Sequence, residues 1–404
     1  MVKIMFDKID YREVESNAMY CVHCGLCRQV LPSEIKNDRF GDICPIGTKF
    51  MFEAYYAPGR NEIARALLRN EFSYEESPKL LEIIYSCLTC GSCDITCRYC
   101  TTLGRVQPGE ITEAIRAKMV KDGVGPLPRH KKWGQSIISN KNPYEEEHSN
   151  RLKWLKGEKP PEQAETLYFV GCTSSYKTQE IASATYAVMK KIGMEVMISP
   201  EEYCCGSPLF RTGQLDIAEQ VMNHNIELIE NSGVKKVVFS CPGCLRTFKK
   251  DYPKFAGPLN FELKHISQEI VELIDKGQIE LDKLNLTVTY HDPCHLGRHL
   301  WPESIYEEPR KILNAIPELQ FKEMERNRDG TWCCGAGGGV KSGFPETSLW
   351  TVKKRLEEAV ETTGAQALVT ACPFCINNFK EGVKKENMSL KIYDLMEIMS
   401  MVLK

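Results

Sequence analysis

Two adjacent cysteines followed by glycine occur twice in this chain, as Cys204-Cys205-Gly206 and as Cys333-Cys334-Gly335. Adjacent side chains on an extended chain diverge, so such a pair suits a body with several irons better than one tetrahedral ion. A lone cysteine precedes each copy and a Cys-Pro-x-Cys sequence follows it. The chain therefore contains an internal repeat of five thiols, namely Cys172, Cys204, Cys205, Cys241, Cys244 and Cys294, Cys333, Cys334, Cys372, Cys375.

Each group of these cysteines follows a short strand-like run, and helical patterns lie between the groups. The runs are Thr166–Val170, Glu195–Ser199 and Lys236–Ser240 in the first copy, and Leu286–Tyr290, Leu319–Met324 and Ala367–Thr370 in the second. Alternating strands and helices predict parallel sheets, whose sites lie beyond the carboxyl ends of the strands. We therefore expect all ten repeat cysteines at sheet edges.

A glycine-rich run, Gly335–Gly339, follows the second adjacent pair. Small residues there would let backbone amides approach inorganic sulfides and tune a cluster by hydrogen bonding. Phosphate binding is the alternative, but neither a Walker lysine nor a G-x-G-x-x-G spacing after a strand accompanies the run.

A second cysteine pattern occupies the first hundred residues, where the triplets Cys21, Cys24, Cys27 and Cys87, Cys90, Cys93 have two-residue intervals. Three thiolates so spaced can wrap one face of a cubane cluster. Cys97 completes the usual run after the second triplet. After the first, Val30-Leu31-Pro32 stands where Cys-Pro is usual, and Cys44-Pro45 comes later, so either an insertion loops out before Cys44 or that ligand is recruited differently.

The repeat resembles the CCG domain of the heterodisulfide reductase family, whose iron–sulfur subunits also serve glycolate, lactate and anaerobic glycerol-3-phosphate dehydrogenases. The two triplets resemble the helical dicluster ferredoxin domain of the same subunits. The resemblance implies one noncubane [4Fe-4S] cluster for each five-cysteine set. It also implies two cubane clusters with crossed ligands, one held by Cys21, Cys24, Cys27 and Cys97, the other by Cys44, Cys87, Cys90 and Cys93.

One thiol, Cys100, is left over by these assignments. It is either an ordinary buried thiol, since free cysteine packs as a small hydrophobe, or a substitute for Cys97. Structural zinc is the alternative to iron–sulfur clusters for the whole cysteine set, but zinc sites are built from four ligands and have no use for the third thiol of a triplet.

These patterns predict an α+β multidomain chain. We expect a helical dicluster ferredoxin domain at 1–122, a linker at 123–165, and two α/β CCG domains with short parallel sheets at 166–283 and 284–404. The linker is rich in proline, glycine and charge. Within it we expect His130 and His148 to be solvated, and Trp133 and Trp154 to fasten the linker to a neighbouring element.

Composition narrows the class of protein. The 404 residues carry a net charge of −2 with both signs interspersed, which does not predict binding to nucleic acid or to an anionic membrane surface. No apolar run approaches a spanning helix and the start is too polar for a signal peptide, so we expect a cytoplasmic protein, or one held at the inner membrane face by a partner. Nineteen cysteines, an odd number, then favour metal ligation over disulfides.

The second copy carries His291-Asp292-Pro293-Cys294-His295, which has no counterpart around Cys172. Reducing a disulfide takes two protons as well as two electrons, so we predict His295 as a proton donor. The alternative is that His295 only bonds the backbone or a sulfide, which is the role we expect for His291 and for the later His299. Arg298 either neutralises cluster charge or binds an anionic substrate group.

Two functions agree with these features. In the one we favour, the chain is the electron-transfer subunit of a multi-subunit oxidoreductase, and its partners are other redox subunits, either a flavoprotein or a membrane cytochrome or quinone-reactive subunit. In the alternative, the chain itself reduces a heterodisulfide between two noncubane clusters. In two further options, the chain is the electron conduit of a flavin dehydrogenase or of an acyl-CoA reductase complex, or it is a scaffold that binds zinc.

Overall fold

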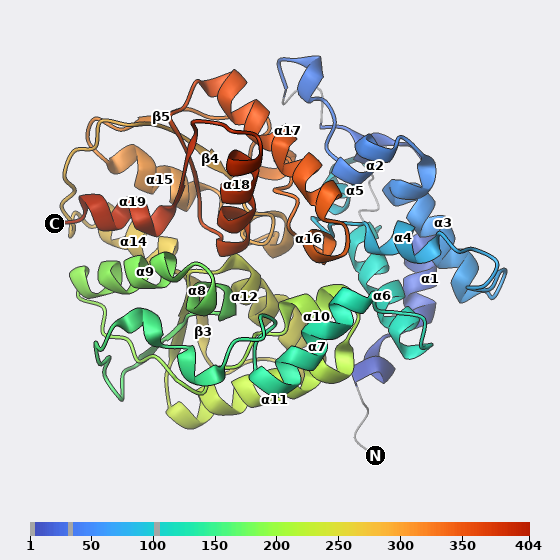
Figure 1. Ribbon diagram of the computed structural model, residues 1–404, viewed down its shortest axis with the longest axis horizontal. Coiled ribbons are helices and arrows are strands. Elements are labelled where there is room, and N and C mark those ends of the chain that lie inside the picture. The colour runs from blue at the N-terminus through green and yellow to red at the C-terminus, as the bar shows by residue number, and fades with distance from the viewer. Residues whose placement is uncertain (1–4, 31–34, 101–105) are drawn as a thin grey trace. The chain divides into compact units, whose positions relative to one another are not determined.

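The computed structural model describes residues 5–30, 35–100 and 106–404, with the side chain of Cys100 outside the description (Figure 1). Part of the expected departure at Val30-Leu31-Pro32 and the possible roles of Cys100 therefore lie outside the described residues. The chain forms two compact units. Unit 1 comprises residues 1–134, 208–219 and 325–358, and unit 2 comprises residues 135–207, 220–324 and 359–404.

Helices build unit 1 in the described residues. Short 3-10 helices are η1 (Met5–Lys8), η2 (Leu26–Arg28), η4 (Asp38–Phe40), η5 (Glu53–Tyr55) and η10 (Arg328–Gly330). The α-helices are α1 (Tyr11–Met19), α2 (Pro45–Phe50), α3 (Ala57–Leu68), α4 (Leu80–Tyr85), α5 (Ser92–Cys100), α6 (Pro108–Lys121), α10 (Ser207–Thr212) and α16 (Val340–Gly343). Helix α10 begins one residue outside the unit, and three longer helices, α7 (Pro128–Asn140), α11 (Leu215–Ser232) and α17 (Pro345–Thr363), extend further past its boundary.

The core of unit 1 forms where α1, α3 and α6 pack together. Its buried residues come from the apolar faces of these helices and of α4, and include Ala64, Leu67, Ile84, Ile115 and Met119. The buried residues of α3 and α4 recur three or four positions apart, which is the spacing of one face of a helix. A proline in the first turn helps to begin both α3 and α6, because the first helical N–H groups have no intrahelical acceptor.

Unit 2 contains two parallel sheets. The first has the order β1-β2-β3, formed by β1 (Thr166–Phe169), β2 (Lys236–Phe239) and β3 (Glu262–His265). The second has the order β5-β4-β6-β7, formed by β4 (Thr287–His291), β5 (Gln320–Phe321), β6 (Ala367–Thr370) and β7 (Lys391–Asp394). One sheet belongs to each copy of the repeat, which confirms the expected α+β architecture with short parallel sheets.

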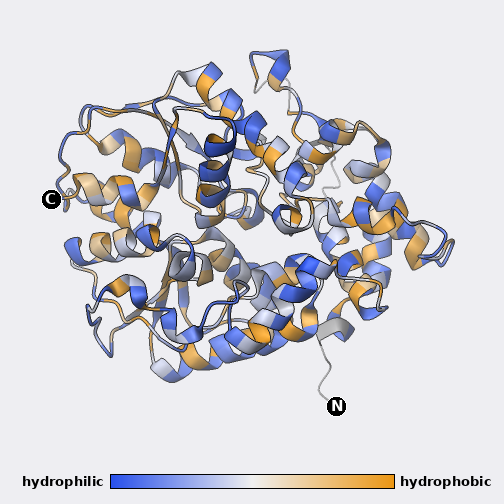
Figure 2. Cartoon of the chain, viewed as in Figure 1, coloured by the Kyte–Doolittle hydropathy of each residue, from blue (hydrophilic) through white to orange (hydrophobic). Residues whose placement is uncertain are grey.

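Helices connect and cover these strands (Figure 1). They are η6 (His148–Asn150), η7 (Lys153–Leu155), α8 (Cys172–Tyr176), α9 (Gln179–Lys191), α12 (Pro242–Arg246), the π-helical turn η8 (Thr247–Asp251), α13 (Tyr252–Ala256), α14 (Ile266–Asp275), η9 (Arg298–Leu300), α15 (Glu307–Ala315), α18 (Pro373–Lys385) and α19 (Leu395–Val402). Helix α19, mostly hydrophobic in Figure 2, packs against α9, so a helix of the second copy covers one of the first.

The predicted strands are mostly confirmed. Five of the six runs form β1, β2, β4, β5 and β6, but Glu195–Ser199 makes only a single parallel bridge, between Met197 and Leu167. Strands β3 and β7 were not predicted. Their sequences, ELKH and KIYD, are only four residues long and half polar, so they do not stand out from a loop or a helix.

The segment that we expected to be a linker contains helix α7. The expectation that His130 is solvated was wrong. His130 is fully buried within unit 1, with its Nε2 2.9 Å from the Gly339 carbonyl oxygen. Burial lowers the pKa of His130 to about 4. The expectation for Trp154 is confirmed, because its ring is buried in unit 2 in edge contacts with Tyr168 and Tyr186.

A buried histidine at the end of β3 predicts a pH dependence of stability. His265 caps α14, where its Nδ1 accepts from the Ser267 N–H, and burial lowers its pKa to about 4. The unfolded chain, with a histidine pKa of about 6.5, binds a proton more readily. Stability contributed by neutral His265 is therefore complete above pH 6.5 and declines as the pH falls towards 4, by about 3 kcal/mol in all.

The measurement is urea unfolding at a series of pH values for the wild type and for His265→Asn, which keeps an N-cap acceptor but does not titrate. We expect the free energy of unfolding of the variant to fall less steeply below pH 6.5. The partly exposed His224 provides the control substitution, His224→Asn. Parallel curves for the wild type and His265→Asn would refute the assignment.

Candidate iron–sulfur centres

The thiols of Cys21, Cys24 and Cys27 gather with Cys97 in unit 1. All four line one cavity, together with Asn61 of α3. Burial raises the pKa of Cys27 to about 12, and the neighbouring thiols Cys44, Cys21, Cys24 and Cys97 raise it further. Cys24 is exposed, so this group of thiols, which we call site A, reaches the surface of unit 1. Gly25, with φ of +78°, supplies the turn between the second and third thiols.

A second group, site B, contains Cys44, Cys87, Cys90 and Cys93. Burial raises the pKa of Cys44, and the nearby thiols Cys90 and Cys87 contribute to the same rise. Burial also raises the pKa of Cys93, whose neighbours include Cys27 of site A. The fold thus brings Cys97 to the first triplet, and it places Cys44 near Cys87 and Cys90 of the second triplet and near Cys27 of the first, so that the two sites lie beside each other.

Two consecutive residues of α3 bear on whether sites A and B suit iron–sulfur clusters. Asn61 is 1% exposed, and neither its amide nitrogen nor its oxygen has a hydrogen-bond partner, although it lines the cavity of site A. Arg60 is 3% exposed, and its neighbours are the thiols of site B. A buried amide without a partner is costly in an apolar cavity. Both side chains fit sites that hold anionic, sulfide-containing groups.

The five thiols of the first repeat copy lie together in unit 2, and we call this group site C. Cys172 begins α8, and its Sγ is 3.8 Å from that of Cys204. Hydrogen bonds between thiols continue from Cys204 to Cys205, on to Cys244 and then to Cys241. Cys205 accepts from both of its neighbours, which lowers its pKa. The pKa of Cys204 is raised by its hydrogen bonds with Cys172 and then Cys205, and that of Cys244 by its hydrogen bonds with Cys205 and Cys241.

The Cys-Pro dipeptides have one structural role. Cys44, Cys241 and Cys372 are each the N-cap residue of a helix whose first turn contains the following proline. Proline suits that position because the missing N–H would have had no intrahelical partner. The motif therefore ends an extended segment, presents a thiol and starts a helix within two residues.

The second repeat copy is divided between the units. Cys294, Cys372 and Cys375 belong to unit 2, whereas Cys333 and Cys334 belong to unit 1. The adjacent pairs of both copies have the same local geometry, since the Gly335 N–H lies 3.4 Å from Cys333 Sγ and the Gly206 N–H lies 3.5 Å from Cys204 Sγ. The repeat in sequence is thus also a repeat in loop structure.

Close packing within unit 1 explains two glycines of the glycine-rich run. A Cβ atom on Gly338 would lie 2.5 Å from the carbonyl oxygen of Cys87, and one on Gly339 would lie 2.6 Å from His130 Nε2. Both glycines also have positive φ angles. The run therefore lets its backbone approach the second ferredoxin triplet, a role that the sequence alone did not indicate.

His295 lies where the two repeat copies meet inside unit 2. A Cβ atom on Gly243, in the Cys241–Cys244 loop of the first copy, would lie 3.5 Å from His295 Nδ1 and 3.6 Å from Cys241 Sγ. Ligand atoms of Cys294, His295 and His299 all lie within 4.8 Å of one another. His295 is thus near Cys294 of the second copy and packs against Gly243 in the cysteine loop of the first. Its role as a proton donor stays a prediction.

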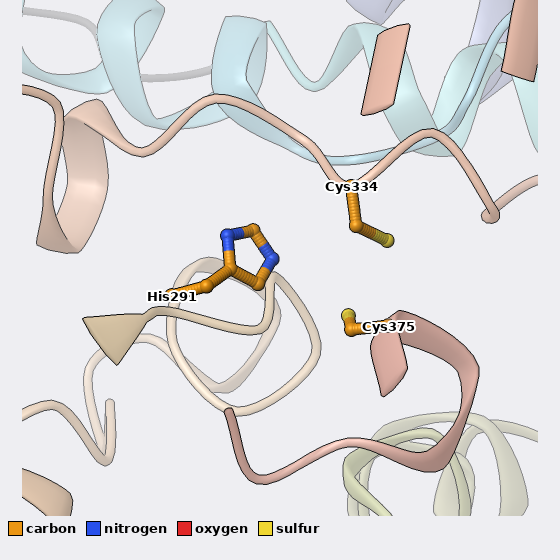
Figure 3. Close-up of side chains that lie close together, drawn as sticks. All are labelled: His291, Cys334 and Cys375. Carbon is orange, nitrogen blue, oxygen red and sulfur yellow. The ribbon is translucent and has the colours of Figure 1, made fainter. Parts of the chain in front are cut away.

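The other polar residues of this loop have structural partners. The carboxylate of Asp292 is buried in an ion pair with Arg310, at 2.7 and 2.9 Å. His291 ends β4, where its ring meets the edge of Phe379, and Figure 3 shows it directed towards Cys375 of α18. Its nitrogen lies within 4.8 Å of Cys375 Sγ. Arg298 is buried.

Sequence analysis missed a charged residue at site C. Arg151 is 1% exposed, and the groups that stabilise its charge include Tyr176, Cys172 and Cys244, although burial lowers its pKa overall. Its ion-pair partner Glu202 also accepts from the N–H groups of Val170 and Gly171, just before Cys172. A lone arginine in a polar stretch gives no signal of burial, so only the fold reveals this contact.

Models of two protein families match the chain. A 4Fe-4S dicluster domain matches residues 17–100, and a cysteine-rich domain, CCG, matches residues 166–249 and 288–380. These ranges contain the four groups of cysteines described above. No helix among the described residues is long and apolar enough to cross a membrane.

Curated relatives carry the same combination. The chain is 35% identical to the D-type subunit of the dihydromethanophenazine:CoB–CoM heterodisulfide reductase of Methanosarcina barkeri, over 94% of this chain and 92% of that protein. It is 36% identical to the B-type subunit of the fumarate reductase (CoM/CoB) of Methanothermobacter marburgensis, over 79% of this chain and 62% of that one. An aspartate racemase from Picrophilus torridus aligns with a TM-score of only 0.29 at 11% identity, covering 59% of this chain and 91% of that chain.

The geometry of site C yields a prediction about Gly171. This glycine has φ of +77°, and a Cβ atom on it would lie 3.0 Å from Cys244 Sγ. We expect Gly171→Ala to lose about four irons per chain, because the added methyl displaces a thiol of site C, while sites A and B keep theirs. Iron and acid-labile sulfide analysis after anaerobic purification measures this.

The matched control is Gly157→Ala, also in unit 2, with φ of +92° and no atom within 4 Å of the added Cβ. This variant carries the backbone strain without the contact. Equal iron contents in the two variants would show that the contact with Cys244 does not matter.

Proposed function

Because the chain belongs to the family of the D-type heterodisulfide reductase subunits, and is thus an iron–sulfur electron-transfer protein, we propose that it relays electrons from two cubane clusters to noncubane clusters in its CCG domains. One observation carries this proposal. Sites A and B lie beside each other, since Cys27 of one site has Cys44 of the other among its neighbours. Two adjacent clusters form a path for single electrons.

The proposed cubane ligands are the thiols of sites A and B. Cys21, Cys24, Cys27 and Cys97 would hold one cluster, and Cys44, Cys87, Cys90 and Cys93 the other. The proposed noncubane ligands are Cys172, Cys204, Cys205, Cys241 and Cys244 in the first CCG domain, and Cys294, Cys333, Cys334, Cys372 and Cys375 in the second. When bound, these groups supply one-electron redox chemistry.

We propose that the electrons come from another redox subunit, either a flavoprotein or a membrane cytochrome or quinone-reactive subunit. Relatives with this architecture are named as subunits of larger reductases. The exposed Cys24 makes site A the point of entry that a partner could reach. Thiolate ligands persist in a reducing compartment, so we place the protein in the cytoplasm, or at the inner membrane face through its partner.

A second function, reduction of a disulfide by this chain itself, is favoured by the position of His295 between thiols of both repeat copies. The balanced reaction adds two electrons and two protons to the S–S bond and yields two thiols. His295 would deliver one of those protons to the departing sulfur, which imidazolium can do near neutral pH.

The first test is anaerobic iron and sulfide analysis with EPR spectroscopy. We expect about sixteen irons per chain, the sum for four clusters. Cys205→Ala should lose the noncubane signal of the first CCG domain and keep the cubane signals. Cys100→Ala is the matched control, because Cys100 is the one cysteine that the ligand sets leave out. Full iron content in Cys205→Ala would remove the five-thiol assignment.

The second test concerns His295. With reduced dye as electron donor and a small disulfide as acceptor, His295→Gln should lower kcat at least tenfold and remove the alkaline limb of the pH profile, with iron content unchanged. His224→Gln, a partly exposed histidine in α11, is the control. If turnover and pH profile stay as in the wild type, His295 has no part in proton delivery.

A further inference from the structure

The first turn of α3 buries an arginine without a carboxylate partner. The side chain of Arg60 is 3% exposed, and its guanidinium donates to the Tyr55 carbonyl oxygen, while its Nε has no hydrogen-bond partner. No ion pair joins it to an acidic side chain among the described residues. Burying a cation without a counter-charge is expensive, so the compensation for Arg60 has to come from elsewhere.

The sulfur atoms of site B provide that compensation once they lose their protons as ligands. Arg60 donates a hydrogen bond to Cys44 Sγ, and the cysteines that act most strongly on its charge are Cys87, Cys44 and Cys93. Although burial lowers the pKa of the guanidinium, these three thiols together raise it. A guanidinium does not lose its proton in any working range of pH, so this is a permanent positive charge on one side of site B.

A second guanidinium adds positive charge near site B. Arg116 of α6 is fully buried and donates to the carbonyl oxygens of Ile84 and Cys87, and its charge also lies near the Cys87 thiol. Two acids lie near these residues: Asp94 accepts from the Gly109 N–H at 2.8 Å and has Cys90 among its neighbours, whereas Glu113, near Arg116, is paired with Arg211. Because Glu113 has a cationic partner of its own, the charges of these residues are positive on balance at site B.

Site A differs from site B in the charge of the side chains around it. The polar side chain buried in its wall is the neutral Asn61. Arg28, near Gly25, is paired with Glu53 and its side chain is 37% exposed. His23 is similarly paired with Glu62 and 39% exposed. Exposed ion pairs are screened by water and largely cancel, so they act weakly on a cluster at site A.

We propose that Arg60 raises the midpoint potential of the cluster at site B above that of the cluster at site A, so that electrons pass downhill from A to B. The inference rests on the proposed cubane ligand sets. Adding an electron makes a thiolate-ligated cluster more negative, and a buried cation stabilises the reduced form more than the oxidised form. The adjacent residues Arg60 and Asn61 then set one direction along the electron path.

The test is a redox titration of the full chain followed by EPR, with the two cubane signals assigned through Cys24→Ser and Cys90→Ser. Arg60→Gln should lower the ratio of reduced to oxidised cluster at site B at least tenfold at a fixed ambient potential, which equals about 59 mV for one electron. Arg60→Lys keeps a positive charge and should change the ratio less than threefold. Arg69→Gln is the control, an exposed arginine just beyond the same helix, paired with Glu15.

The inference is overturned if Arg60→Gln leaves the potential of the cluster at site B unchanged, or if the cluster at site A already has the higher potential in the wild type. The wild-type order of potentials provides this second test even where Arg60→Gln does not fold. Failure of the proposed function is distinguishable, because a wild-type chain without iron at sites A and B would give no cubane signals to titrate.

Discussion

Buried thiolates must be compensated by positive charge, and this requirement shapes both units. The thiols of Cys27, Cys44 and Cys93 are packed beside one another, and burial raises the pKa of each. As thiolates they would repel one another in a medium that screens charge poorly. Iron provides the compensation when it binds, and metal ligation is coupled to loss of the thiol protons. The protein adds fixed charge of its own, with Arg60 in unit 1 and Arg151 in unit 2.

A few repeated local structures of the backbone bring several thiols close together. A short parallel strand ends, a cysteine follows, and a helix begins, as at the ends of β2 and β6. Where several thiols approach one another there is no space for side chains between them. Gly171, against Cys244, and Gly338, against the backbone of Cys87, occupy such places.

Much of this architecture could be predicted from short stretches of the sequence. The strands before Cys172, Cys241 and Cys372 and the two cysteine triplets were recognisable, because each depends on neighbours a few residues away. Strands β3 and β7 escaped recognition because they are short and half polar. The burial of His130 and Arg151 escaped it because both lie in a stretch whose composition is typical of a solvated linker.

The sequence by itself determined the chemistry of this protein, since residue types and spacing specify thiolate ligation, the number of thiol groups and the repeat that contains them. Tertiary structure alone decided which distant residues meet. It brought Cys97 to the first triplet and Cys44 to the second, turned Arg60 towards site B, and set His295 against the Cys241–Cys244 loop. These contacts join residues far apart in the chain, and they form only when helices and strands pack, so no local pattern can encode them.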